Sequence, residues 1–345
     1  MALIVLTDKC NLSCRCCFRP ATGPRSEPAW SFAELEVCLA ELVAAGQTSA
    51  FFSGGEPTLW RDRDVGLPRL LAATSQAGLA AVFVSNGHIF HEYRSTTAFL
   101  DEYFALSSSP LQIVLSIDLW HEGTWMECRS PALDSLLCWR ESHTADSQLM
   151  LEVASIWCLE DTMNIPPQDF AVYSNAGVKI SYLPLVELGR ATESHFIPRL
   201  CPSGPRKDNL GSYGEVIRKR LGLSSEEWSA LENRKLLGPC FAVDGLTLGL
   251  DRQYWLCNDR AEEKLHVASA GKLSQAAIVS CLARNPLVQA FRQVGVGEVI
   301  RQCVTEDGLI TADDAQIALN EHHSFGISGR ASCGLCKSLP SELFS

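Results

Sequence analysis

Apolar residues along this chain form short continuous runs, and between these runs they recur every three or four positions. Short apolar runs bounded by turn-forming residues are typical of buried β-strands, whereas the longer spacing is typical of amphipathic helices. The runs predict strands over residues 2–7, 49–54, 80–86, 111–118, 149–156 and 178–185. The segments between them predict helices over residues 31–46, 66–78, 95–106, 132–142 and 166–177.

Six strand–helix units in succession predict an α/β fold. Because the strands are almost continuously apolar, both faces of the sheet should be covered, as in a parallel sheet. We expect a partial (β/α)6 TIM-like barrel over residues 1–190, since the polar and glycine-rich stretches follow the strands, where barrels place their sites. In the first helix, Ser31 and Glu34 match a capping box, and Gly46 supplies a stop.

The pattern changes after residue 190. Residues 191–239 predict a linker with one helical segment, and residues 240–345 predict a small α+β domain. Within that domain, residues 241–259 indicate a β-hairpin between two cysteines. The 345 residues exceed the usual size of a single core, which agrees with a barrel followed by a second, smaller unit.

Composition narrows the functional classes. The chain is 46% hydrophobic and 20% charged, as in folded globular proteins. No stretch approaches the roughly 20 apolar residues of a membrane span, and the apolar start is too short for a secretory signal, so we expect a cytoplasmic protein that does not act at a membrane. The formal net charge of −11 argues against nucleic acid as the main partner.

The cysteines indicate the chemistry. In a reducing compartment, 15 cysteines are poor candidates for a disulfide framework, so metal binding or catalysis is the leading explanation. Cys10, Cys14 and Cys17 follow the first predicted strand with C-x3-C-x2-C spacing. Three such thiolates can ligate three irons of a [4Fe–4S] cluster and leave the fourth iron open to a ligand. A zinc loop or a group of inert thiols is the alternative.

This motif resembles the signature of the radical S-adenosylmethionine (SAM) superfamily. Further stretches follow later strands in matching order: SGGEPTLW after the second, VSNG after the third and LSIDLWHE after the fourth. The resemblance implies that the GGEP stretch holds the SAM amino group and that polar residues after the third and fourth strands bind its ribose and carboxylate. It assigns to SAM Gly54, Gly55, Glu56, Pro57, Asn86, Ser116, Asp118 and Phe18.

One position departs from the family pattern. Cys16 stands where the family usually has an aromatic residue near the adenine, so adenine stacking would come from Phe18 or from the sixth strand near Tyr182. The chemistry implied by the resemblance is reductive cleavage of SAM. An electron donor such as flavodoxin or ferredoxin reduces the cluster, and the resulting 5′-deoxyadenosyl radical abstracts hydrogen from an unactivated C–H bond.

Four more cysteines, Cys240, Cys257, Cys333 and Cys336, resemble the ligand set of a twitch domain, the short form of the SPASM domain. The resemblance implies one auxiliary [4Fe–4S] cluster. A structural zinc site takes the same ligands, and buried thiols that only pack are a further alternative. Cys38, Cys138 and Cys281 are among the remaining cysteines, which are expected to pack as small hydrophobic residues. The alternatives are that Cys201 completes a site, or that a solvent-exposed thiol donates hydrogen to a product radical.

Charged residues near the predicted barrel mouth suggest the substrate. The candidates for substrate binding or proton transfer are Asp118, His121, Glu187 and Arg190. We expect a small polar metabolite, for example the sugar of a nucleoside or aminocyclitol precursor, modified by dehydrogenation, epimerisation or decarboxylation. The alternatives are modification of a ribosomal peptide by crosslink or thioether formation, and a non-enzymatic iron–sulfur or zinc protein.

Overall fold

The computed structural model describes residues 1–14, 17, 30–117, 121, 124, 129–143, 148–157, 167–184, 245–256 and 266–284. All six predicted strands are present in this part of the chain. They pair in parallel in chain order, which confirms the predicted parallel sheet. Their bounds are β1 Ala2–Val5, β2 Ser49–Ser53, β5 Ala80–Ser85, β6 Leu111–Ser116, β7 Leu149–Trp157 and β8 Lys179–Pro184.

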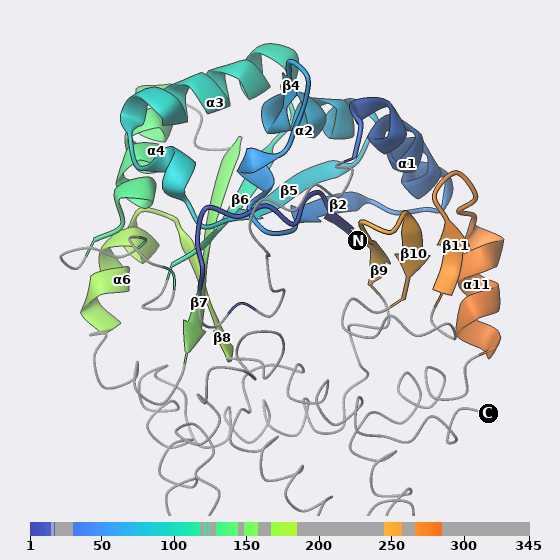
Figure 1. Ribbon diagram of the computed structural model, residues 1–345. Coiled ribbons are helices and arrows are strands. Elements are labelled where there is room, and N and C mark those ends of the chain that lie inside the picture. Colours follow the sequence, from blue (N-terminus) through green and yellow to red (C-terminus); the bar gives the residue numbers. More distant parts are fainter. Residues whose placement is uncertain are drawn as a thin grey trace, which may run out of the picture.

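The predicted helices are confirmed as well, and Figure 1 shows α1 to α4 along the outer side of the curved sheet. In α1, the Glu34 backbone N–H donates to the Ser31 hydroxyl at 3.3 Å, and the Ser31 backbone N–H donates to Glu34 Oε2 at 2.8 Å, so the capping box is formed. The bounds are α1 Phe32–Ala44, α2 Leu67–Gln76, α3 Tyr93–Leu106, α4 Pro131–Ser142 and α6 Pro167–Asn175.

The hydrophobic core lies between the sheet and these helices. Side chains such as Leu35 and Leu39 of α1, and Phe83 of β5, are almost completely removed from solvent. Each such side chain contributes about 1.5–3 kcal/mol relative to leaving it exposed. The core therefore anchors the sheet, and the loops at the carboxyl ends of its strands are built on a rigid base.

Short elements follow two of the strands and were not expected from the sequence. After β2 come the 3-10 turn η1 Pro57–Leu59 and a small antiparallel pair, β3 Arg61–Asp62 and β4 Val65–Gly66. After β5 comes a second 3-10 turn, η2 His88–Phe90. These turns redirect the chain directly after the GGEP and SNG stretches, so the polar residues of both stretches are held at strand ends.

The predicted hairpin is confirmed, with β9 Leu246–Leu248 antiparallel to β10 Gln253–Trp255. It is joined to the barrel, because β9 pairs in parallel with β1, next to the N-terminus in Figure 1. β11 His266–Ser269 pairs with β10 and precedes α11 Gln275–Arg284. The described strands thus form a nine-stranded sheet in the order β11-β10-β9-β1-β2-β5-β6-β7-β8. The boundaries at residues 190 and 240 stay predictions.

None of the helices within the described residues is both long and apolar enough to cross a bilayer.

Candidate functional site

Residues 6–17 follow β1 and carry Cys10, Cys14 and Cys17; we call them the cysteine loop. The loop begins beside the GGEP turn, because the backbone pairing of β1 and β2 continues beyond the two strands. The Gly55 N–H donates to the Thr7 carbonyl at 2.7 Å, and the Glu56 N–H donates to the Lys9 carbonyl at 2.7 Å. Cys10 comes directly after Lys9. The cysteine motif and the GGEP stretch, which are separated by 36 residues in the sequence, therefore share one edge of the sheet.

Gly54 and Gly55 are required by this close approach. A Cβ at Gly54 would lie 2.3 Å from the Thr7 carbonyl oxygen, and one at Gly55 would lie 2.3 Å from the Lys9 carbonyl oxygen. Gly54 also has a φ of +148°, which disfavours other residues. The sequence interpretation expected these glycines to let a ligand approach. In the structure it is the cysteine loop that approaches them, and their contact with SAM stays a prediction.

Glu56 is a buried carboxylate that accepts four hydrogen bonds from the chain. Oε1 accepts from the Thr58 N–H at 3.1 Å, the Thr58 hydroxyl at 2.7 Å and the Ser85 hydroxyl at 2.9 Å; Oε2 accepts from the Asn86 N–H at 2.8 Å. Burial raises the pKa of Glu56, and these hydrogen bonds oppose that rise. Glu56 thus joins η1 to the end of β5.

Asn86 continues the connection from β5 to the cysteine loop. Its Nδ2 donates to Asn11 Oδ1 at 2.7 Å and lies 4.0 Å from Cys10 Sγ, while its Oδ1 accepts from the His88 N–H at 3.1 Å. The side chain is buried, with 7% exposed. The sequence interpretation placed Asn86 against SAM, and the structure adds contacts with the cysteine loop that motif spacing does not reveal.

The three cysteines of the motif carry a donor set suited to iron. Cys14 is buried, and Cys10 and Cys17 are partly buried. Burial is the main cause of a raised pKa at Cys10; the negative charges of Glu56, Cys14 and Cys17 add to it. Soft sulfur donors on one loop fit a [4Fe–4S] cluster, which takes one thiolate per iron.

Among the described residues, no group of three His, Cys, Asp or Glu side chains is arranged to hold a single metal ion. Ligation of a cluster by Cys10, Cys14 and Cys17 stays a prediction.

The other predicted site residues are only partly covered. Ser116 is the last residue of β6 and is partly exposed. Pro57 opens η1 and is buried. His121 lies in a turn, where its carbonyl accepts from the Thr124 hydroxyl at 2.8 Å. Eight predicted site residues lie outside the described part: Phe18, Asp118, Glu187, Arg190, Cys240, Cys257, Cys333 and Cys336.

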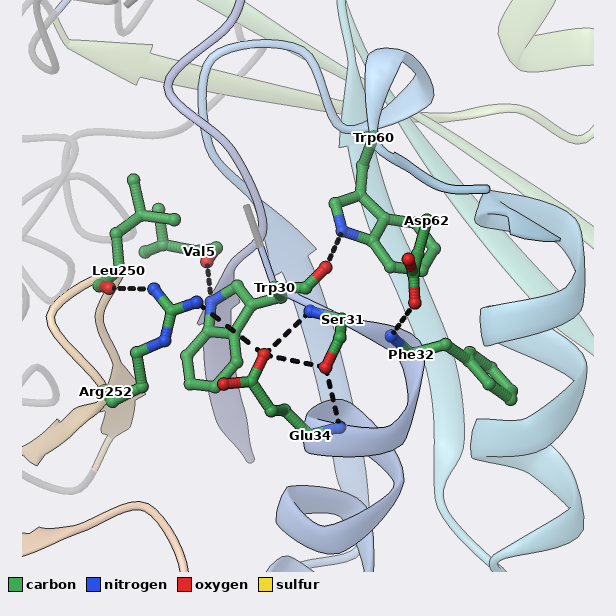
Figure 2. Close-up of polar contacts among 9 residues, drawn as sticks. All are labelled: Val5, Trp30, Ser31, Phe32, Glu34, Trp60, Asp62, Leu250 and Arg252. Carbon is green, nitrogen blue, oxygen red and sulfur yellow. Dashed lines mark hydrogen bonds and ion pairs between the residues drawn. The ribbon is translucent and has the colours of Figure 1, made fainter. Parts of the chain in front are cut away.

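A set of contacts that the sequence did not reveal, the hairpin junction, connects the turn between β9 and β10 with residues next to β1, α1 and η1 (Figure 2). The Arg252 guanidinium lies 4.4 Å from the centre of the Trp30 ring and 3.7 Å from Glu34 Oε2. Trp30 Nε1 donates to the Val5 carbonyl at 2.9 Å, and Trp60 Nε1 donates to the Trp30 carbonyl at 3.0 Å. Trp30 therefore contacts the last residue of β1, the residue after η1, and the hairpin turn.

Glu41 on α1 makes a second connection to the C-terminal segment. Its carboxylate accepts from the Tyr254 hydroxyl at 3.1 Å and from the backbone N–H groups of Gly271 at 2.9 Å and Leu273 at 2.8 Å. These residues come from β10 and from the turn between β11 and α11. The hairpin is thus held by α1 as well as by β1.

The comparisons with known proteins point to the same family as the cysteine, GGEP and SNG motifs. Residues 4–118 match the family model described as the Radical SAM superfamily. A segment is 35% identical over 82 residues to Fe-coproporphyrin III synthase of Methanosarcina barkeri, and the match covers 24% of this chain and 20% of that protein. The match thus spans only about a fifth of the relative's length.

Two solved structures have a similar fold. Native anSMEcpe with bound AdoMet has a TM-score of 0.56 and 13% identity, with 98% of this chain and 99% of that chain covered. SuiB of Streptococcus suis bound to precursor peptide SuiA has a TM-score of 0.54 and 14% identity, with 98% and 72% covered. These likenesses confirm the predicted α/β partial barrel, and at such identities they show the fold alone.

Proposed function

Residues 4–118 form a radical SAM domain, and on this premise we propose that the chain is an enzyme that uses SAM to abstract hydrogen from a small polar metabolite. The sugar of a nucleoside or aminocyclitol precursor is the substrate class that we propose. The observation that carries the SAM chemistry is the joining of three motifs at one sheet edge: the cysteine loop, the GGEP turn and the SNG stretch.

In this proposal Cys10, Cys14 and Cys17 hold a [4Fe–4S] cluster, and Gly54 to Pro57, Asn86 and Ser116 surround SAM. When bound, cluster and SAM together supply a 5′-deoxyadenosyl radical after one-electron reduction by a flavodoxin- or ferredoxin-type donor. The chain's own contribution is positional. Glu56 and Asn86, both buried, order the backbone around the cysteine loop.

Anaerobic reconstitution tests this proposal. The wild-type chain should bind iron and sulfide, show the EPR signal of a reduced [4Fe–4S] cluster and release 5′-deoxyadenosine from SAM when reduced. Cys10→Ala should lose the release of 5′-deoxyadenosine. Cys138→Ala serves as the control, because Cys138 is exposed on α4 and the expectation that it packs was wrong. Zinc in place of iron, or release that persists in Cys10→Ala, would contradict the proposal.

We also propose an auxiliary [4Fe–4S] cluster held by Cys240, Cys257, Cys333 and Cys336. What supports it is the position of Cys257, which directly follows buried Leu256 at the end of the hairpin that pairs with β1. The iron content distinguishes the possibilities, with about eight irons per chain for two clusters and about four for one. About four irons together with one zinc would identify the C-terminal set as a zinc site.

A ribosomal peptide is the second substrate class. The observation that favours it is the shared fold with SuiB, whose structure was solved with a precursor peptide. Incubation with nucleoside, aminocyclitol and peptide panels, scored by substrate-dependent 5′-deoxyadenosine release, separates the two classes. Release stimulated only by peptides would replace the metabolite proposal.

A further inference from the structure

Asn86 lies between the end of β5 and the cysteine loop, where one hydrogen bond holds its backbone and two hold its side chain. Its backbone N–H donates to Glu56 Oε2 at 2.8 Å, its Oδ1 accepts from the His88 N–H at 3.1 Å, and its Nδ2 donates to Asn11 Oδ1 at 2.7 Å. The side chain is also buried. The two hydrogens of Nδ2 are therefore fixed in direction, and they face the cysteine loop.

Cys10 Sγ lies 4.0 Å from Asn86 Nδ2, and it also accepts from the Leu12 backbone N–H at 3.4 Å. Cys10 thus has two N–H donors directed at its sulfur, one from its own loop and one from Asn86, the residue after β5. A thiolate that ligates iron carries negative charge, which increases when the cluster is reduced. Hydrogen bonds to cluster sulfurs are one of the factors that set the reduction potential of such clusters.

We propose that Asn86 is a positioning residue that donates a hydrogen bond to the Cys10 thiolate and thereby raises the reduction potential of the cluster. This inference rests on the proposed function, because it needs a cluster at Cys10. It differs from the sequence interpretation, in which Asn86 contacts SAM. A donor in this position makes reduction easier, since it stabilises the added charge on the side of the cluster that Cys10 ligates.

The test is a potentiometric EPR titration of the anaerobically reconstituted chain without SAM, so that contacts with SAM cannot affect the result. Asn86→Leu removes the donor at similar size, and its midpoint potential should shift to a more negative value. Asn86→Asp keeps the acceptor for the His88 N–H but replaces the donor with an oxygen. Its midpoint should shift in the same direction, at least as far, because the carboxylate adds negative charge.

Thr58→Val is the matched control. It removes the hydroxyl bond to Glu56 Oε1 from the same network but leaves the Asn86 amide in place. Its midpoint should stay at the wild-type value. The proposal is overturned if both Asn86 variants titrate like wild type. It is also overturned if Thr58→Val shifts as far as Asn86→Leu, because loosening of the network would then explain the change.

Iron content is measured on the same samples and separates this proposal from the proposed function. Absence of a [4Fe–4S] signal from the wild-type chain refutes the proposed function itself. A wild-type cluster with normal iron content, together with unchanged midpoints in the Asn86 variants, refutes only the role of Asn86. If Asn86→Leu fails to fold, Asn86→Asp carries the test, since it preserves the size and the Oδ1 acceptor.

Discussion

Glu56 is a charged residue at a place where charge is costly. A buried carboxylate is tolerated when donors surround it, and Glu56 has four, from Thr58, Ser85 and the Asn86 backbone. A ligand amino group at this position would have to share oxygens that the fold already uses. We therefore expect Glu56 to affect the stability of the domain as well as any cofactor contact.

Glu56→Gln should lower the free energy of unfolding by about 1–3 kcal/mol, because the amide NH2 would face one of the N–H or O–H donors and leave it unpaired. Urea denaturation monitored by circular dichroism measures the change. Glu36→Gln on the exposed face of α1 is the matched control and should change stability by less than about 0.5 kcal/mol. Equal stability of the wild type and Glu56→Gln would show that the four hydrogen bonds contribute little.

Cys38 gives a second prediction at this scale. It lies on the buried face of α1, and burial raises its pKa to about 11 despite a hydrogen bond with Tyr254. At pH 8 only about one molecule in a thousand carries the reactive thiolate, so Cys38 should resist iodoacetamide in the folded protein, and modification should rise with pH. Peptide mass mapping measures this, with exposed Cys138 as the internal control. Rapid modification of Cys38 at pH 8 would contradict the packing of α1 against β10.

At the scale of elements, the hydrophobic pattern was enough to predict six strands and five helices, because each is determined by neighbouring residues. The pairing of β9 with β1 could not be predicted in this way. It joins three-residue stretches more than 240 positions apart, and such short stretches carry no signal about their partner. The same holds for Glu41 and Tyr254, whose contact spans 213 positions. Motif spacing likewise identified Asn86 but not its contact with Cys10.

The hairpin junction provides a prediction for these elements. Arg252→Ala removes the cation–π contact with Trp30 and the pairing with Glu34, and should cost on the order of 1 kcal/mol, most of it from the stacking because Glu34 is exposed. Hydrogen exchange should become faster in the amides of β9 and β10. Arg61→Ala, at an exposed position of β3, is the control and should leave their exchange unchanged.

Arg252→Lys refines the test. Lysine keeps the positive charge but lacks the flat guanidinium, so it should recover only part of the lost protection. Full recovery would show that charge alone holds the hairpin. Unchanged exchange in Arg252→Ala would show that the Glu41 contacts and the β1 pairing are sufficient without Arg252.

At the scale of the whole molecule, one sheet connects the two halves of the chain. β1 leads into the cysteine loop at its carboxyl end and pairs with β9 of the hairpin along its length. The pairing is parallel, so β9 begins beside the start of β1, and antiparallel β10 returns to that same end. β10 therefore ends, at Trp255, beside the start of β1, at the opposite end of the strand from the cysteine loop. The described end of the hairpin and the start of the cysteine loop thus lie at opposite ends of β1.

This separation predicts that the two clusters can be removed independently. Cys240→Ala with Cys257→Ala should lower the iron content from about eight to about four per chain and keep the release of 5′-deoxyadenosine, because the contacts that the structure describes for the cysteine loop are with residues at the ends of β2 and β5. Cys10→Ala should abolish that release while the C-terminal iron remains.

Product formation is scored separately from 5′-deoxyadenosine. If the double variant releases 5′-deoxyadenosine but forms no product, the auxiliary cluster takes part after hydrogen abstraction, as an electron acceptor would. If it loses both, the C-terminal unit is needed for the SAM site itself, and the independence argued from the sheet topology is wrong.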